Sequence, residues 1–146
     1  MLVTNAHVVN GISMARLHDG RSYHAKVIRK DRQADLALLL IPVGGLTCAN
    51  ARDSRTLRIG QMVVAVGHPM GDVGAVTLGT VHRISRADLV EADIRLAPGN
   101  SGGPLADASG KVVGIECMVA NGMGVAIATA AVGQFVQRCL VAVGAG

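Results

Sequence analysis

Short apolar segments separated by turn-forming residues run through most of this 146-residue chain. Glycine occurs 19 times, and pairs such as Asp19-Gly20 and Asn121-Gly122 favour tight turns between antiparallel strands. Short apolar runs bounded by such turns predict β-strands. The expected strands cover residues 2–4, 14–28 (a hairpin turning at Asp19-Gly20), 34–41, 61–67, 75–84, 89–95, 112–119 and 123–128, with further turns at Asn10-Gly11, Gly71 and Ser109-Gly110. The pattern indicates an all-β fold, either a barrel or a sandwich.

The last part of the chain has a different period. Thr129 is a suitable N-cap residue, and the apolar residues after it recur every three or four positions, as on one face of a helix. The residues expected on that face are Val132, Phe135, Val136, Cys139, Leu140 and Val143. We therefore expect one α-helix over residues 129–143 that closes the fold.

Charge and aromatic content argue against a nucleic-acid-binding protein. The formal net charge is +4, and the excess lies in residues 1–73, which carry nine Lys and Arg against five Asp and Glu. The densest basic stretch, KVIRKDR at residues 26–32, is short and interrupted, as expected for a solvated strand end. The chain has one Tyr, one Phe and no Trp, so it offers almost no rings for base stacking. We expect no nucleic-acid partner.

The cysteines and the hydropathy exclude further classes. Cys48, Cys117 and Cys139 have no paired spacing, which argues against a zinc site and a disulfide framework and favours reduced thiols. No apolar run reaches the roughly 18 residues of a membrane helix, and no secretory signal peptide is apparent. We expect no metal, no cofactor and no membrane segment, and the sequence leaves the compartment open.

The segment APGNSGGPL, residues 97–105, carries the strongest chemical signal. Glycines on both sides of Ser101 let the backbone bend sharply, so that successive N–H groups can converge while the hydroxyl projects outward. A serine nucleophile beside converging amide donors is what acyl transfer requires. The alternative is a tight turn in which Ser101 has no chemical role.

A serine nucleophile needs a base to accept its proton and a further group to orient that base. His7, in TNAHVV, ends an expected strand, and Asp35, in ADLALL, stands at the start of a strand that is otherwise apolar. A carboxylate buried there needs a partner. His7 and Asp35 are therefore the candidate base and orienting residue; the alternatives are an ordinary core histidine and a strand-entry cap. The remaining histidines, expected on the surface or in the layer of residues around the site, are His18, His24, His68 and His82.

Three segments in this order, LVTNAHVV, DRQADLALL and APGNSGGPL, resemble the His, Asp and Ser motifs of chymotrypsin-fold serine proteases, and most closely those of the HtrA/Deg group. Other segments, DGRSYHAKVIRKD, LRIGQMVVAVGHPMG, VTLGTV and MGVAIATAAVGQFVQ, resemble the same group. The similarity extends from residue 2 to about residue 140. It implies two antiparallel β-barrels of chymotrypsin type with the active site between them, and a C-terminal α-helix.

The resemblance also implies roles for individual residues. Ser101 is expected to be the nucleophile, His7 the general base and then acid, and Asp35 the group that fixes the imidazole tautomer and stabilises its cation. The expected oxyanion hole consists of the N–H groups of Gly99 and Ser101. The residues expected to wall the substrate pocket are Leu96, Glu116, Cys117, Met118 and Val119. Leu96 and a closing strand rich in Val, Ala and Ile make the wall mainly aliphatic, and no acidic residue is obvious at its base, which favours Val, Ala or Leu before the scissile bond.

In this family two strands and a turn precede the histidine motif, and this sequence begins after the corresponding position. We therefore expect a partial first barrel in residues 1–50, a second barrel in residues 57–128 and the helix in residues 129–143, without a PDZ domain. An incomplete barrel would leave a strand edge open to a second copy of the chain or to another partner.

Two functions follow from these expectations. The first is a serine endopeptidase of HtrA-like type that hydrolyses unfolded or exposed polypeptide through an acyl-enzyme. The second is a catalytically impaired β-barrel that binds peptide or a partner through a strand edge. The complete set of motifs favours the enzyme.

Overall fold

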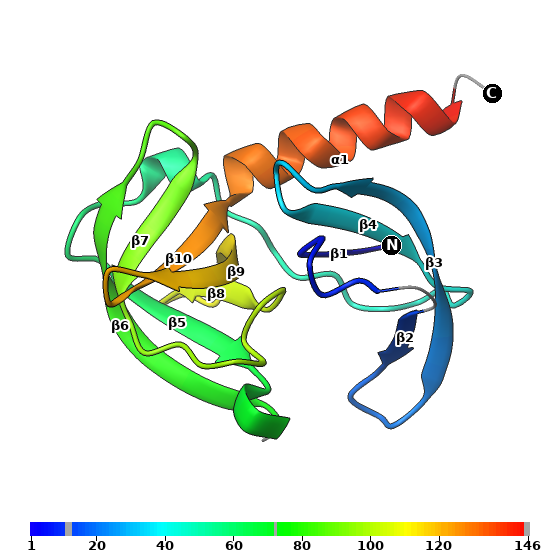
Figure 1. Ribbon diagram of the computed structural model, residues 1–146, viewed down its shortest axis with the longest axis horizontal. Helices are drawn as coiled ribbons and strands as arrows, with labels where there is room; N and C mark the ends of the chain where they lie inside the picture. The colour runs from blue at the N-terminus through cyan, green and yellow to red at the C-terminus, as the bar shows by residue number, and fades with distance from the viewer. Residues whose placement is uncertain (11–12, 72, 145–146) are drawn as a thin grey trace. The chain divides into compact units, whose positions relative to one another are not determined.

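A computed structural model describes residues 1–10, 13–71 and 73–144 of the chain. These residues form two compact units (Figure 1). Unit 1 consists of Met1–Cys48 and Phe135–Gly146, and unit 2 of Ala49–Gln134. The expected turn at Asn10-Gly11 lies partly outside the described residues, because Gly11 is not among them.

Unit 2 is built on a closed antiparallel barrel, seen in Figure 1 as the strands from green to orange. Its strand order is β10-β7-β6-β5-β8-β9. The strands are β5 (Met62–Gly67), β6 (Ala75–Ile84), β7 (Leu89–Asp93), β8 (Pro104–Asp107), β9 (Val112–Ala120) and β10 (Met123–Ala128).

The interior of this barrel is filled by aliphatic side chains. Val63 and Ala65 of β5 are fully buried, whereas the side chain of Met62, the first residue of the strand, is exposed. Side chains on a strand point alternately to its two faces, so alternate residues of β5 face the barrel interior. The same alternation brings Val81, Val90 and Leu105 into one core cluster. The interior of a six-stranded barrel is narrow enough to be filled by aliphatic side chains, so the near absence of aromatic residues is no obstacle to packing.

Unit 1 contains an open four-stranded antiparallel sheet with the order β1-β4-β3-β2 (Figure 1). Its strands are β1 (Leu2–Thr4), β2 (Ser13–Arg16), β3 (Ser22–Asp31) and β4 (Leu36–Leu40). The central strand β4 is buried on both faces, from Leu36 to Leu39, which explains why its sequence is a continuous apolar run rather than an alternating one.

The helix α1 (Thr129–Gly144) follows β10 directly, as the sequence predicts. Thr129 is not the N-cap that the sequence predicts, because it is itself the first helical residue. Its hydroxyl donates to the carbonyl of Arg52 (2.6 Å) and accepts from the amide of Ser54 (3.1 Å), while Ser54 Oγ accepts from the amide of Ala130 (3.2 Å). The helix start is thus capped by a hydroxyl 76 residues earlier in the chain.

Burial along α1 follows the predicted face only in part. Phe135 and Cys139 are buried, and Val132 and Val136 are half-buried. Leu140 shares the same helical spacing but is 46% exposed. The side chain of Val143 lies outside the described part of the structure.

The mostly β architecture with a closed barrel and one C-terminal helix is confirmed. Strand β8 was missed, as were two short 3-10 turns, Ser54–Thr56 and Pro69–Gly71. No helix among the described residues is long and apolar enough to cross a membrane.

Candidate active site

In unit 1, His7 and Asp35 form a tightly connected pair. The carboxylate Oδ2 of Asp35 lies 2.8 Å from Nδ1 of His7, and Oδ1 accepts the backbone N–H of His7 at 3.0 Å. This contact arises because β1 pairs antiparallel with β4 in the register Thr4↔Ala37, so the residues after β1 meet those before β4. The carboxylate therefore fixes both the position and the ring of His7.

The backbone of Asp35 is held as firmly as its side chain. Its φ of 51° lies in the left-handed region, which Asp tolerates better than most residues. Its carbonyl accepts the backbone N–H of Ala6 and the side-chain amide of Asn5, both at 3.1 Å. Asn5 is fully buried, and sequence reasoning missed it although it lies in the same TNAHVV segment.

The imidazole is left available on its other nitrogen. A proton on Nδ1 donated to Asp35 makes Nε2 the acceptor. The His7 side chain is 49% exposed and that of Asp35 25%. The pair borders a hollow of about 380 Å³ whose lining residues are Ala6, His7, Asn10, Lys30, Arg32 and Asp35.

In unit 2, Ser101 lies in the loop between β7 and β8. Gly99 makes this loop possible, since its φ is +106° and a Cβ atom there would lie 2.2 Å from the carbonyl oxygen of His68. The amide of His68 in turn donates to the carbonyl of Gly99 at 3.1 Å. A further turn follows, in which Gly103 donates to the carbonyl of Asn100 at 2.9 Å. The predicted sharp, glycine-dependent bend is therefore present.

The backbone amides of this loop fall into two groups. Those of Asn100, Gly102 and Gly103 donate to the carbonyls of Ala97, Glu116 and Asn100, respectively. Those of Gly99 and Ser101 make no hydrogen bond to any residue that the structure describes. The two amides left without an acceptor are the two expected from the sequence to form an oxyanion hole. Ser101 Oγ donates to the carbonyl of Cys117 at 3.3 Å.

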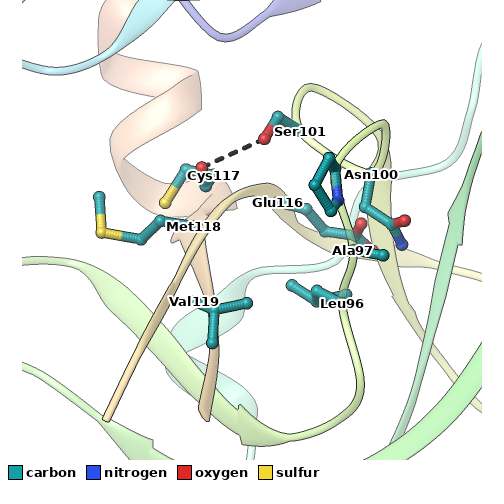
Figure 2. Close-up of a pocket in the computed structure, with 9 residues that line it drawn as sticks. Leu96, Ala97, Asn100, Ser101, Glu116, Cys117, Met118 and Val119 are labelled. Carbon is teal, nitrogen blue, oxygen red and sulfur yellow. Dashed lines mark hydrogen bonds between the residues drawn. The ribbon is translucent and has the colours of Figure 1, made fainter. Parts of the chain in front are cut away.

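A pocket of about 410 Å³ opens beside Ser101 (Figure 2). In this view Leu96 and Val119 lie on the side opposite Ser101. Met118 and Val119 are each 53% exposed. All five residues expected in the pocket wall line it, and the complete lining is Leu96, Ala97, Pro98, Asn100, Ser101, Glu116, Cys117, Met118 and Val119.

One of these residues departs from the aliphatic wall that the sequence suggested. Glu116 is only 1% exposed, and burial raises the pKa of its carboxyl to about 8. The Asn100 side chain and the Val66 backbone favour the ionised form, but neither makes a hydrogen bond of normal geometry to the carboxylate oxygens. Burial thus favours the uncharged form of the Glu116 carboxyl.

The structure brings the expected pocket residues, Gly99 and Ser101 together in unit 2, and His7 with Asp35 in unit 1. Among the described residues, no group of three or more His, Cys, Asp or Glu side chains is arranged to hold a metal ion.

The known proteins that this chain resembles in sequence are serine proteases. Residues 1–115 match the trypsin-like peptidase domain. The chain is 39% identical over 127 residues to a probable periplasmic serine endoprotease DegP-like of Marinomonas sp. (strain MWYL1), a match covering 81% of this chain and 27% of that protein. It is 37% identical over 145 residues to the putative serine protease HhoA of Synechocystis sp., covering 87% and 37% of the two chains.

Solved structures agree with these matches. The HtrA-type protease AlgW with decapeptide superposes with a TM-score of 0.88 at 30% identity, covering 94% of this chain and 47% of that one. The serine endoprotease from Yersinia pestis gives a TM-score of 0.87 at 30% identity, covering 94% and 52%. The matched region thus spans about half the length of these solved chains, and 27% and 37% of the length of the two curated relatives. This chain belongs to the trypsin-like peptidase family and, within that family, to the HtrA-like serine proteases of chymotrypsin fold.

Proposed function

We propose that this chain carries the catalytic machinery of a serine endopeptidase, with Ser101, His7 and Asp35 as its triad. The single observation that carries the proposal is the His7–Asp35 pair, in which one carboxylate binds both the ring Nδ1 and the backbone amide of the same histidine. A carboxylate that binds both groups keeps the imidazole in one tautomer and one orientation. A general base needs both, and an isolated surface histidine has neither.

The reaction divides into two half-reactions. Ser101 Oγ attacks the scissile carbonyl carbon, and His7 Nε2 takes the hydroxyl proton. The carbonyl oxygen becomes an oxyanion and accepts hydrogen bonds from the amides of Gly99 and Ser101. Collapse of this intermediate breaks the C–N bond, and His7 gives its proton to the leaving amine. Water then attacks the acyl-enzyme by the same route, and the acid product leaves.

Asp35 supports the charged state of this cycle. When His7 becomes an imidazolium, the carboxylate at 2.8 Å stabilises the positive charge. Because the same carboxylate also holds the His7 backbone, protonation of the ring is not expected to release the residue.

The substrate class follows from the pocket and the relatives. The hollow beside Ser101 is lined largely by apolar groups, with Leu96 and Val119 opposite the hydroxyl, and about 410 Å³ accommodates a medium-sized side chain. AlgW has been solved with a decapeptide and with a tripeptide, which supports polypeptide as the substrate. We expect Val, Ala or Leu before the cleaved bond.

Active-site titration with a fluorophosphonate probe tests the proposal without knowledge of the natural substrate. Wild-type protein should be labelled, and Ser101→Ala should lose both labelling and peptide cleavage. Loss of the nucleophile costs roughly 10⁴–10⁶ in kcat. Ser22→Ala is the matched control, because Ser22 is exposed on β3 and its hydroxyl makes no hydrogen bond to the described residues.

The test also separates the alternative function. A barrel that only binds peptide would retain a fluorescently labelled peptide while leaving the probe unreacted. Labelling that persists in Ser101→Ala would identify another nucleophile and overturn the assignment.

A further inference from the structure

We propose that His68 is a positioning residue of this active site: its imidazole closes the connection between β5 and β6, and this connection fixes the direction of the Gly99 amide. Its effect on the rate rests on the proposed hydrolase function. The attachment of this histidine to the loop that carries Ser101 is a property of unit 2 alone.

The imidazole of His68 bridges the two ends of the β5–β6 connection. β5 ends at Gly67 and β6 begins at Ala75, and these two residues form the last pair of the ladder between the strands. Nδ1 of His68, the residue after β5, accepts the backbone N–H of Gly74, the residue before β6, at 2.9 Å. The side chain thus continues the pairing of the two strands by one position.

This bond requires one form of the imidazole. A backbone N–H can only donate, so Nδ1 carries no proton and the ring proton lies on Nε2. His68 is exposed, so its ring adds little to the packed interior of the barrel. A substitution of His68 therefore removes mainly the acceptor for the Gly74 amide.

Two backbone amides of the connection hold the loop that carries the nucleophile. The N–H of His68 donates to the carbonyl of Gly99 at 3.1 Å, and the N–H of Met70 donates to the carbonyl of Pro98 at 3.0 Å. The two segments also lie close together, because a Cβ atom on Gly99 would lie 2.2 Å from the carbonyl oxygen of His68. A shift of the connection therefore displaces the loop as well.

The bond from Met70 fixes the direction of the Gly99 amide. The Pro98 carbonyl and the Gly99 N–H belong to one planar trans peptide unit, so they point to opposite sides. With the Pro98 oxygen bound to Met70, the Gly99 N–H faces away from the connection. An oxyanion hole needs donors that are already oriented when the charge develops, and the Met70 bond provides this orientation.

The connection adopts a backbone conformation that needs support from its surroundings. Met70 has a φ of 55°, in the left-handed region that residues with a side chain disfavour, and Gly71 and Gly74 follow with φ of 94° and 73°. A non-glycine residue stays in this region only where neighbouring contacts hold it. Two such contacts end on His68: its carbonyl accepts the N–H of Gly71 at 3.1 Å, and its Nδ1 accepts that of Gly74.

A direct chemical role is less suitable for this imidazole. His68 is not among the residues that line the pocket beside Ser101, and its Nδ1 is occupied by the Gly74 amide. His68 acts on the reaction through the Met70 bond and through the peptide unit that this bond orients.

Two variants separate the acceptor of this side chain from its bulk. His68→Asn retains an acceptor, because Oδ1 of asparagine is bonded to Cγ, as Nδ1 of histidine is. His68→Leu retains a branched side chain of similar reach without an acceptor. His82→Leu, at an exposed position of β6, is the matched control for the loss of a surface imidazole.

Peptide cleavage tests the effect on the rate. The oxyanion forms only during the reaction, so a misdirected Gly99 amide should change kcat rather than KM. We expect His68→Leu to lower kcat about tenfold or more, with KM changing by less than about twofold. His68→Asn should stay within about threefold of the wild-type kcat, and His82→Leu should keep wild-type kinetics. A residue that only stabilised the fold would not produce this split or this rescue.

Nuclear magnetic resonance reads the contact without activity. Ser101→Ala protein labelled with ¹⁵N should show Nδ1 of His68 unprotonated and Nε2 protonated in mildly alkaline buffer, and the ring resonances are assigned by their loss in His68→Asn. The amide resonances of Gly74 and Gly99 should both move when His68→Leu is added. With His68→Asn the Gly99 resonance should stay near its original position.

The ring and amide resonances decide the proposal first. A ring proton on Nδ1 of His68 would overturn it even if no variant folds, and so would a Gly99 amide that does not respond to His68→Leu. A His68→Asn variant as slow as His68→Leu would also overturn it. If the wild-type protein does not react with a fluorophosphonate while the Gly99 amide follows His68, the hydrolase function is rejected and the attachment of the loop to His68 stands.

Discussion

Asp35 binds His7 twice, through Oδ2 to the ring Nδ1 at 2.8 Å and through Oδ1 to the backbone N–H at 3.0 Å. The second bond distinguishes this pair from a chance surface ion pair, since exposed pairs with one contact contribute little. The two residues are 28 positions apart in the sequence, and the pairing of β1 with β4 brings them together. The sheet of unit 1 therefore positions His7, the proposed base, beside Asp35.

Asp35→Asn should therefore lower kcat by roughly 10⁴-fold if His7 is the base. An asparagine that keeps the His7 amide on its carbonyl oxygen turns its NH₂ group toward Nδ1, which favours the wrong tautomer. The melting temperature should change far less than activity. Steady-state peptide cleavage measures the effect, and Asp19→Asn, in the hairpin between β2 and β3, is the control. Activity within tenfold of wild type would contradict the role of Asp35.

Several elements could be predicted from sequence because their signals are local. Strands β6 and β10 begin and end where the pattern places them, at residues 75–84 and 123–128. The positive-φ glycines at Gly20 and Gly122 were visible as turn pairs. Strand β8 was missed because it is four residues long and starts with Pro104, immediately after a glycine-rich loop that hides its alternation.

Features that depend on distant parts of the chain could not be predicted. Nothing near Thr129 indicates that Ser54 caps the helix. The same holds for Glu116: the sequence placed it in the pocket wall, but the burial that raises its pKa depends on how β9 packs in the fold. The motifs identified His7, Asp35 and Ser101 as candidates, whereas the buried amides of Asn5 and Asn100 beneath them needed the structure.

Gly99→Ala should abolish labelling of Ser101. A methyl group at this position would meet the His68 carbonyl oxygen at 2.2 Å, and the φ of +106° is strained for any other residue. Gly110→Ala is the matched control, because its φ is +77° but no atom lies within 4 Å of the added carbon. It should lose about 1 kcal/mol of stability from strain and keep its activity. Equal labelling in the two variants would show that the loop tolerates the displacement.

The raised pKa of Glu116 also predicts how stability varies with pH. The folded protein holds this proton up to about pH 8, whereas the unfolded chain releases it near its ordinary value of 4.5. The stabilising contribution is thus complete below pH 4.5 and is lost progressively up to pH 8, at about 1.4 kcal/mol per pH unit. The free energy of unfolding of Glu116→Gln relative to wild type should rise over this range. Urea titrations at pH 5, 6.5 and 8 measure this difference in the free energy of unfolding. A difference that stays the same at all three pH values would show that the pKa of Glu116 is not raised.

Asp107 should show the opposite dependence. Its Oδ1 accepts bonds from Ser109 and from the amide of Lys111, and its Oδ2 accepts from Arg52 at 2.9 Å. These bonds, that of Ser109 first, lower the pKa of the buried carboxyl below its usual 3.8. Their stabilisation is present above pH 3.8 and is lost as the pH falls further.

Asp107→Ala removes the carboxylate partner of Arg52, whose side chain is 28% exposed and still bonds to Thr56, and should cost about 1–3 kcal/mol at pH 7, with a smaller difference from wild type at pH 3. Urea midpoints give both values. Asp93→Ala, at the exposed end of β7, is the control. A loss below 1 kcal/mol at pH 7 would mean that the Arg52 contact contributes no more than a surface pair.

The cysteines give a prediction about accessibility. None of Cys48, Cys117 and Cys139, all within the described residues, forms a disulfide. Cys48 is exposed, whereas Cys117 and Cys139 are about 5% and 4% exposed, and the Cys117 thiol donates to the carbonyl of Val125. A chromogenic disulfide reagent should therefore react rapidly with one thiol per native chain and with three in denaturant, since buried thiols react only when the structure opens. Cys48→Ser should remove the fast phase alone. A denatured count of one would reveal a disulfide, and two fast thiols would show that the packing around β9 or α1 is looser than the structure indicates.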